Sequence, residues 1–325
     1  MAPTTLHPAA TLEGMELMPG TSSGDWLLAR AGGWTQVGGV VGTGFEAYAR
    51  ILHPATARRV DPSDIDEWGI PRTVEEGRWR WEEVAGRTGA TMHPLVQWLA
   101  MTGGEQDPEL PGDWSVQSPE QGLLAPDLLA ATCEHLAAAT ATPQDLVAGL
   151  WAGHGHLHGG GVPYRSGPRW LLDLPWWQGR RWSLGRGWPI GRRRQSGRQR
   201  SPGGSPDGPA ISRALRARAR RGPFLDWPER AMLRFSTSAR ELGDPGWPSE
   251  AGWVREIDGS PAMTPQLLWP AGHEWALASE IDGDSTIVAG SAELVAAILA
   301  DPRLEAFPVG PEDALTEDSD LVNGS

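Results

Sequence analysis

The chain has 325 residues, of which 39% are hydrophobic, and a formal net charge of −13. This hydrophobic fraction is large enough for a folded core, which excludes disorder along the whole chain. The acidic balance disfavours general binding of nucleic acid or anionic membranes and favours solubility.

The scarcity of some residue types excludes several kinds of site. The single cysteine, Cys133, rules out an intrachain disulfide and a thiolate metal cluster, and its apolar helical surroundings predict a buried, unreactive thiol. All 28 basic residues are arginines, so a Walker-type phosphate loop, which needs a lysine, is excluded. Residues 1–24 lack a signal-peptide pattern, and no apolar run approaches the ~20 residues that span a bilayer, so we expect a cytoplasmic protein.

The first half of the chain predicts short elements of both kinds. Residues 37–52 are a β-rich run that ends in an alternating pattern. Helical spacing over 78–86 and 127–139 predicts two helices, the second of which begins after a proline. A capping pattern at 142–145 leads into 146–153, LVAGLWAG, which reads as a strand.

The second half predicts a compact succession of elements. Residues 274–282 and 286–290 are expected to pair as a hairpin around a Gly-Asp-Ser turn. Ser291 then caps a helix over 293–302, and 304–309 is a candidate last strand.

Charge is unevenly distributed along the chain. Residues 165–221 carry 15 arginines and two acidic residues, which leaves 13 arginines and 39 acidic residues elsewhere, a net charge of −26. Residues 178–212 have no apolar period and are expected to be disordered. Such asymmetry indicates a segment that is physically separate from the folded body.

Strands and helices are mixed without regular βαβ alternation, which favours an α+β fold. We expect one discontinuous domain with a mixed or antiparallel sheet, interrupted by an Arg/Gly/Pro-rich disordered insertion. The expected parts are a flexible N-terminus at 1–24, the first part of the domain at 25–160, the basic low-complexity insertion at 161–222, the second part at 223–309, and an acidic disordered tail at 310–325.

Four stretches resemble a family of uncharacterised cytoplasmic proteins from GC-rich bacteria. They are GFEAYARILHP (44–54), residues 81–98, residues 142–155 and, most specifically, residues 267–306, and together they cover about half the chain. The resemblance implies no activity, because the family has none assigned. It implies that the parts on either side of the insertion belong together. Its members usually have other residues in place of His156 and His158, which argues against a metal role throughout the family.

Three histidines, His154, His156 and His158, precede a run of glycines. Residues i and i+2 of a strand point to one face about 6.5–7 Å apart, so His154 and His156 can reach one metal, whereas His158 is too distant without a bend. No other histidine stands in a ligand spacing such as HExxH that points back to this stretch. The remaining histidines of the well-patterned parts are His53, His93, His135 and His273. We favour a strand end or loop over a metal site.

The arginine-rich segment 165–221 can neutralise phosphates, and its tryptophans can stack on unpaired bases. Biased composition and the acidity of the remaining chain favour a solvated insertion instead. Glu280, Asp282 and Asp284 suggest calcium, but the EF-hand pattern with its terminal Glu is absent, and a hairpin turn explains these acids. The glycine-rich run 37–45 has no GxGxxG.

Eighteen tryptophans against two tyrosines and four phenylalanines make this chain unusual. We expect those of the two domain halves to fill the core rather than line an aromatic groove, and an exposed one would favour a protein-binding face. The tryptophans concerned are Trp68, Trp79, Trp81, Trp98, Trp253, Trp269 and Trp275.

These observations favour a non-enzymatic module that binds another protein. Two alternatives stay open: a metal-dependent hydrolase using His154 and His156, and nucleic-acid binding through residues 165–221. The sequence assigns no catalytic, cofactor-binding or metal-binding residue, and it implies no cofactor and no membrane partner.

Overall fold

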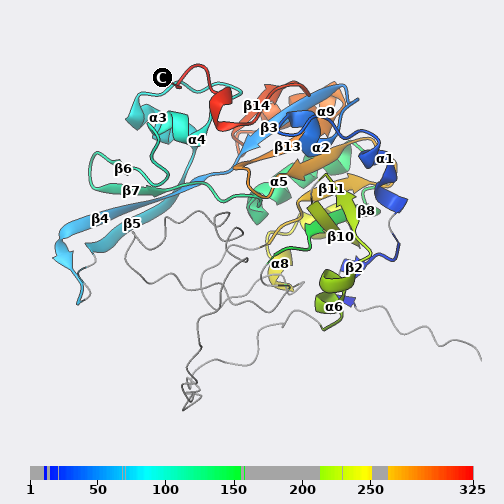
Figure 1. The fold of residues 1–325 in the computed structure, drawn as a ribbon. Coiled ribbons are helices and arrows are strands. Elements are labelled where there is room, and N and C mark those ends of the chain that lie inside the picture. Colours follow the sequence, from blue (N-terminus) through cyan, green and yellow to red (C-terminus); the bar gives the residue numbers. More distant parts are fainter. Residues whose placement is uncertain are drawn as a thin grey trace, which may run out of the picture.

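A ten-stranded sheet forms the centre of this computed structural model (Figure 1). Its strand order is β1-β2-β10-β8-β11-β12-β13-β3-β14, with β9 paired to β10 off this path. The pairings between the described strands of this sheet are antiparallel. The structure describes residues 11–324 apart from 13–14, 21, 68, 70, 155–156, 158–212, 229 and 251–262.

The bounds of the elements follow in chain order. The strands are β1 (Thr11–Leu12), β2 (Met15–Leu17), β3 (Ala47–Leu52), β4 (Ala55–Ile65), β5 (Pro71–Trp79), β6 (Glu109–Leu110), β7 (Trp114–Gln117), β8 (Leu146–Trp151), β9 (Leu225–Trp227), β10 (Arg230–Thr237), β11 (Leu267–Pro270), β12 (Ala276–Ser279), β13 (Ser285–Gly290) and β14 (Ala306–Val309). The helices are η1 (Ser22–Gly24), α1 (Asp25–Leu28), α2 (Val37–Val41), α3 (Trp81–Thr88), α4 (Trp98–Met101), α5 (Pro126–Ala138), α6 (Arg213–Arg221), α7 (Ala239–Leu242), α8 (Trp247–Glu250), α9 (Ala292–Ala300) and η5 (Glu317–Ser319).

Strands from both sides of the basic insertion share the large sheet. β8, from the first half, lies between β10 and β11, and β3 lies between β13 and β14. Neither half can complete the sheet alone, because each of these strands finds both its neighbours in the other half. The predicted α+β class with a mainly antiparallel sheet is confirmed.

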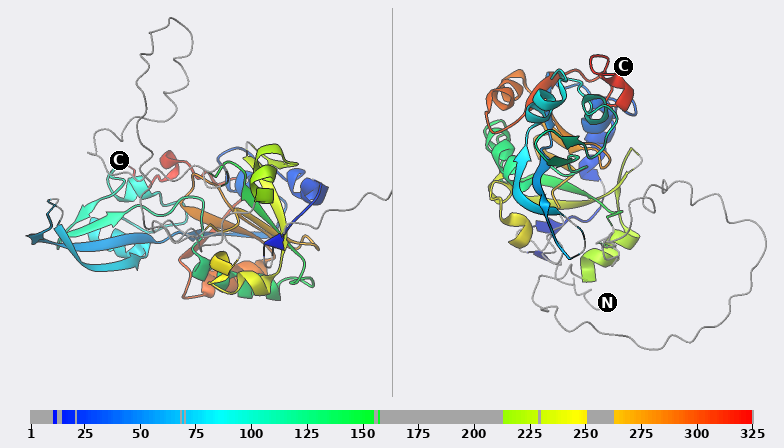
Figure 2. Two further views of the ribbon diagram at one scale, coloured as in Figure 1. Left: turned by 90° about the horizontal axis from the view of Figure 1, so that it is seen from below. Right: turned by 90° about the vertical axis from the view of Figure 1, so that its left-hand side faces the viewer.

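Helices cover both faces of the sheet, as the views in Figure 2 show. α5, α7 and α9 pack on one face, where Leu136, Leu242 and Ile298 join a core with sheet residues such as Leu277 and Val288. α1 and α2 cover the other face. The side chains of the second core include Leu27, Val37, Val41, Met232, Trp269 and Ile287. Because helices cover both faces, β13 is buried at every position instead of alternating between buried and exposed residues.

A smaller sheet of order β5-β4-β7-β6 extends from one end of the molecule (Figures 1 and 2). Its base packs with α3 and α4 around Trp81 and Trp98, whose rings meet edge to face with centroids 5.3 Å apart. The far part of the β4–β5 hairpin is exposed and carries cross-strand ion pairs such as Arg59–Glu75.

Several elements lie where periodicity and capping signals predict them. The helix expected over 127–139 is α5, and the expected hairpin is β12–β13. The Ser291 side chain caps α9 by accepting a hydrogen bond from the Leu294 backbone N–H.

The prediction of a β-rich run over 37–52 is wrong for its first part. Residues 37–41 form α2, and the strand begins only at Ala47. Tertiary contacts decide this, since the backbone N–H groups of Val37 and Gly38 donate to the carbonyls of Asp313 and Pro311. A Cβ on Gly39 would lie 2.1 Å from the Gly33 carbonyl oxygen, so only glycine permits this close approach.

Both ends of the chain are more ordered than expected. The predicted disordered tail is wrong for 310–324, which pack against the body and bury Asp320. The flexible N-terminus is wrong for β2, which pairs with β10, while residues 1–10 lie outside the described part.

The basic insertion expected at 161–222 ends in a helix. α6 buries Leu215 and Ala219, four residues apart on one face, against the core. The predicted disorder over 178–212 lies outside the described residues. No helix in the described part of the chain is long and apolar enough to cross a membrane.

Candidate functional site

A pocket of about 180 Å³ opens where the β12–β13 turn meets the loop before α2 and the C-terminal segment. Two arginines line it, Arg50 from β3 and Arg230 from β10, and so do the three acids of the turn. Apolar side chains complete the wall. They are Trp34, Val40, Ile287 and Leu315.

Arg50 is buried and held from several sides. Its Nε donates to Ser285 Oγ over 2.9 Å, and its Nη1 donates to the Val96 carbonyl over 2.8 Å. Its Nη2 lies 3.3 Å from Asp284 Oδ1. Burial raises the pKa of the Asp284 carboxyl, and the charge of Arg50 opposes this rise. Arg50 therefore neutralises the acid deepest in the pocket.

Arg230 pairs with the other two acids of the turn. Its Nη2 lies 2.6 Å from Glu280 Oε1 and 2.9 Å from Asp282 Oδ2. Its guanidinium carbon lies 5.7 Å from the ring centroid of Trp34, a cation–π distance. Trp34 is 53% exposed and is the one exposed tryptophan among the described residues. The rim thus combines a solvent-facing aromatic ring with an ion-pair network.

The charges that line this pocket do not balance. Its three acids exceed its two arginines by one negative charge. Among the lining residues that the structure describes there is no histidine or cysteine, and the Ser285 hydroxyl is held by Arg50. The ionisable side chains among them are therefore carboxylates and guanidinium groups.

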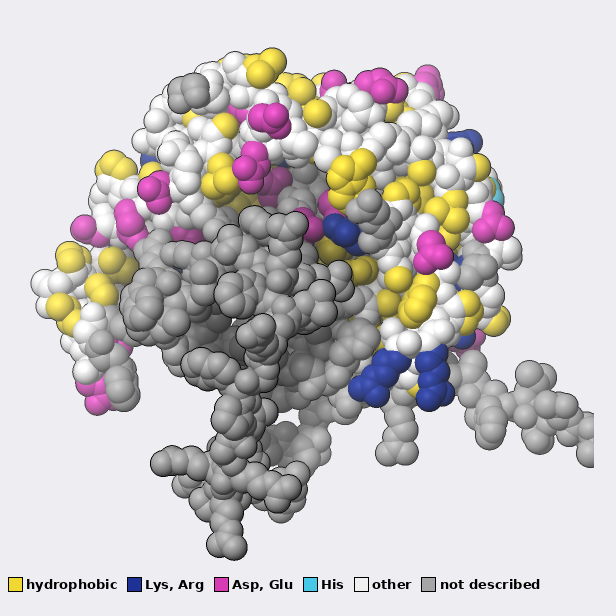
Figure 3. All heavy atoms as spheres, viewed as in Figure 1, with side chains coloured by type: hydrophobic (Ala, Val, Ile, Leu, Met, Phe, Trp, Pro, Cys, Tyr) yellow, Lys and Arg dark blue, Asp and Glu magenta, His cyan; other side chains and the backbone are white. Residues whose placement is uncertain are grey.

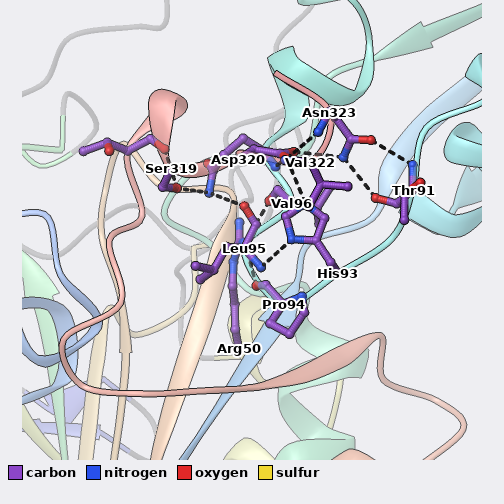
Figure 4. Close-up of polar contacts among 12 residues, drawn as sticks. Arg50, Thr91, His93, Pro94, Leu95, Val96, Ser319, Asp320, Val322 and Asn323 are labelled. Atoms are coloured by element: carbon purple, nitrogen blue, oxygen red, sulfur yellow. Dashed lines mark hydrogen bonds and ion pairs between the residues drawn. The ribbon is translucent and has the colours of Figure 1, made fainter. Parts of the chain in front are cut away.

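The C-terminal segment is held by a group of hydrogen bonds around Asp320, which we call the clasp, next to the loop that binds Arg50 (Figure 4). Asp320 accepts hydrogen bonds from His93 Nε2 at 2.8 Å, from the Gln97 backbone N–H at 3.0 Å and from the backbone and side chain of Asn323. Burial alone raises the pKa of Asp320, but these hydrogen bonds hold it well below its usual range. Arg50 donates to the Pro94 and Val96 carbonyls, so the clasp and the pocket share one loop.

A second hydrogen-bonded network runs through the interior from the Glu120 carbonyl to Ser279. His53 Nδ1 donates to the Glu120 carbonyl over 2.7 Å, so Nε2 accepts from the Thr286 hydroxyl at 2.8 Å. Thr286 Oγ1 in turn accepts from the Ser279 hydroxyl, 2.7 Å away. Burial lowers the pKa of His53 to about 4. All of these groups have partners, and His53, Thr286 and Ser279 are buried, so we interpret this hydrogen-bonded network as structural.

A wider groove of about 680 Å³ lies between the base of the β4–β5 hairpin and α5. Two of its arginines form ion pairs: Arg78 Nη1 lies 2.8 Å from Asp127, and Arg303 Nη2 lies 2.7 Å from Glu134. The third, Arg80, donates to the Pro302 carbonyl. Glu305 accepts from the first two backbone N–H groups of α3. The carboxylates and guanidinium groups of these ion pairs neutralise each other, so the pairs supply no net charge that could select a ligand.

Of the three closely spaced histidines, only His154 lies in the described part of the chain. His154 follows β8 with its ring centroid 5.2 Å from that of Trp151, and His156 and His158 lie outside the described residues. His93 and His135 bond to Asp320 and Asp301, respectively, and His273 stacks on Trp26 with ring centroids 4.2 Å apart. Within the described ranges, no group of three or more His, Cys, Asp or Glu residues can hold a metal.

The tryptophans of the two halves fill the core, as expected. Trp79, Trp81, Trp98, Trp269 and Trp275 are buried, whereas Trp68 and Trp253 lie outside the described residues. The indole N–H of Trp81 donates to the His53 carbonyl, 2.7 Å away, and that of Trp275 donates to the Leu136 carbonyl.

Comparison with known proteins adds no assignment. No family model, curated protein or solved structure matches this chain. The resemblance to a bacterial family therefore stays a prediction, and the site rests on geometry alone.

Sequence reasoning found the acids of the pocket but not their partners. The hairpin turn was predicted, yet Arg50 and Arg230 come from strands that are 234 and 50 residues away from the acids they bind. Trp34, in a glycine-flanked loop, carried no periodic signal. An exposed tryptophan is the feature that was expected to favour a protein-binding face.

Proposed function

We propose that this protein is a non-enzymatic binding module whose partner is another protein, contacted at the Trp34 pocket. The observation that carries the proposal is a tryptophan 53% exposed beside a pocket with an excess of acid. Tryptophan is enriched among the residues that dominate binding energy at interfaces.

The charge of the pocket indicates what the partner presents there. Asp282, whose side chain is largely exposed, and Glu280 already hold one guanidinium beside the Trp34 ring. A basic side chain of the partner meets the same combination of carboxylate and aromatic face, in a protein with a net charge of −13. We therefore expect a basic partner surface.

Replacement of Trp34 by alanine is expected to weaken partner binding by about 2 kcal/mol, roughly 30-fold in Kd, because a central aromatic anchor is lost. The partner is first captured from extracts of the native cells with the wild-type protein and identified by mass spectrometry. Its affinity is then measured by calorimetry with both components purified, at two salt concentrations.

Ile65→Ala is the matched control, since Ile65 is equally exposed but lies on the distant β4–β5 hairpin. Its affinity should equal that of the wild type. Binding should also weaken as salt rises, because charge attraction contributes. Equal binding by Trp34→Ala and wild type, or an inert monomer that captures nothing, contradicts the proposal.

The two alternatives receive unequal support. For a hydrolase using His154 and His156, no group of three or more His, Cys, Asp or Glu residues that could hold a metal occurs among the described residues, which do not include His156. For nucleic-acid binding through 165–221, the described portion is α6, whose Arg220 and Arg221 are exposed. This second observation leads to a different site.

A further inference from the structure

Arg234 is a buried guanidinium with most of its hydrogen-bonding capacity unused. It lies in β10 and is 2% exposed. Its Nη1 donates to Ser23 Oγ, while Nε and Nη2 are buried and have no hydrogen-bond partner among the described residues. Its cross-strand neighbour on β8 is Gly149, which offers no side chain. Arg50, the other fully buried arginine of the sheet, is by contrast bonded at all three nitrogens.

The surroundings of Arg234 add positive charge instead of compensating it. Burial lowers the pKa of Arg234, the charge of Arg218 in α6 lowers it further, and the charge of Asp25 has a smaller effect in the opposite direction. Arg218 is itself partly exposed and donates through Nη2 to the Met18 carbonyl over 2.8 Å. Burying a charge without a counter-charge costs several kcal/mol, so a folded protein retains a guanidinium such as that of Arg234 only when something compensates its charge.

α6 continues the positive surface outward. The helix has the sequence RALRARARR, without an acidic residue. Arg220 and Arg221 are exposed, and Figure 3 shows basic side chains gathered over this part of the molecule. Arg218 therefore connects a solvent-facing basic patch to the unpaired guanidinium inside, in a protein that is otherwise acidic.

We propose that Arg234 and Arg218 form a phosphate-binding site at the junction of η1, β10 and α6. A phosphate group supplies negative charge and several oxygen acceptors, which match the planar fork of donors on a guanidinium. The free Nε and Nη2 of Arg234 bind one edge of the group, Arg218 closes over it from the solvent side, and Ser23 holds the guanidinium in place. The ligand is either a small phosphate compound or the phosphodiester of a nucleic acid.

The test compares two probes on the full chain in a phosphate- and sulfate-free Tris chloride buffer. One probe is inorganic phosphate, and the other is an oligothymidylate. Binding is measured by calorimetry and by the shift in Tm. Arg234→Met and Arg218→Met are expected to weaken binding of the effective probe about tenfold or more, because each removes charged hydrogen bonds. Arg221→Met, an exposed arginine of the same helix, is the matched control and should retain binding of inorganic phosphate.

Arg234→Met also tests the absence of a protein counter-charge. Without phosphate this variant should melt no lower than the wild type, since it removes an uncompensated buried charge and keeps the apolar stem. Phosphate should then raise the Tm of the wild type but not that of the variant. Because Arg218 is partly exposed, Arg218→Met should change phosphate binding without disturbing the folded core.

The outcomes separate the sources of the phosphate. Binding of inorganic phosphate that depends on Arg234 supports a small-molecule site, and binding of the oligonucleotide alone with the same dependence supports a nucleic-acid ligand. Failure of both probes to bind overturns the proposal. It is also overturned if Arg234→Met binds like the wild type, or if Arg221→Met lowers oligonucleotide binding as much as Arg234→Met, since surface charge then explains the result.

Discussion

Replacement of Asp320 by alanine is expected to lower the free energy of unfolding by about 3 kcal/mol, because it leaves several buried donors without their acceptor. The carboxylate takes hydrogen bonds from His93, from the Gln97 backbone and from Asn323, and it is 2% exposed. Urea denaturation at pH 7 measures the change. The loss should come with release of the C-terminal segment, visible as increased proteolysis after residue 310.

Asp318→Ala is the matched control, since this acid lies two residues away on the exposed side of the same turn. It should leave the urea midpoint nearly unchanged. Asp320→Asn should fall between the two, because the amide retains one oxygen acceptor but loses the charge. If Asp320→Ala and Asp318→Ala have equal stabilities, the clasp does not stabilise the fold.

The free energy of unfolding is expected to fall by about 3 kcal/mol between pH 6.5 and pH 4 because of His53. Burial lowers the pKa of this imidazole from 6.5 to about 4, so in this window the unfolded chain binds a proton that the folded protein does not. The contribution of neutral His53 is complete above pH 6.5 and is lost progressively as the pH falls to 4. Urea midpoints at several pH values across this range give the slope.

A variant without the imidazole separates this group from the others. His53→Gln removes the titration, so its stability should depend less steeply on pH, although it is less stable than the wild type at pH 7. His273→Gln, at an exposed position, should keep most of the wild-type slope. Equal slopes for His53→Gln and wild type contradict the assignment. Asp320 affects stability at lower pH. Because its pKa is lowered in the folded protein, its stabilising contribution is lost only as the pH falls below the usual pKa of a carboxyl group.

Local signals predicted several elements well. Leu129, Cys133 and Leu136 recur at helical spacing, and the resulting α5 buries them on one face. The Asp-Gly chemistry of the turn predicted the hairpin β12–β13. These elements follow from nearest-neighbour physics, in which side-chain period, cap and turn residue act within a few positions.

The failures share a physical cause. α2 was taken for a strand because valines favour strands, but the close approach of the Gly39 backbone to Gly33 decided its conformation. The tail was taken for a disordered acidic run, yet Asp320 is satisfied by donors from residues 93–97. Composition counts charges but does not show which donors will meet them after folding.

The sequence by itself determined the α+β class, the membership of both halves in one domain, the burial of the tryptophan core and the lack of any lysine. Only the tertiary structure decided that Arg50 and Arg230 meet the acids of the turn, that Trp34 remains at the surface, and that Arg234 is enclosed without a carboxylate partner. The reason is that the fate of a charge depends on burial and on partners many positions away. Both are fixed when the strands assemble, and neither leaves a local pattern in the chain.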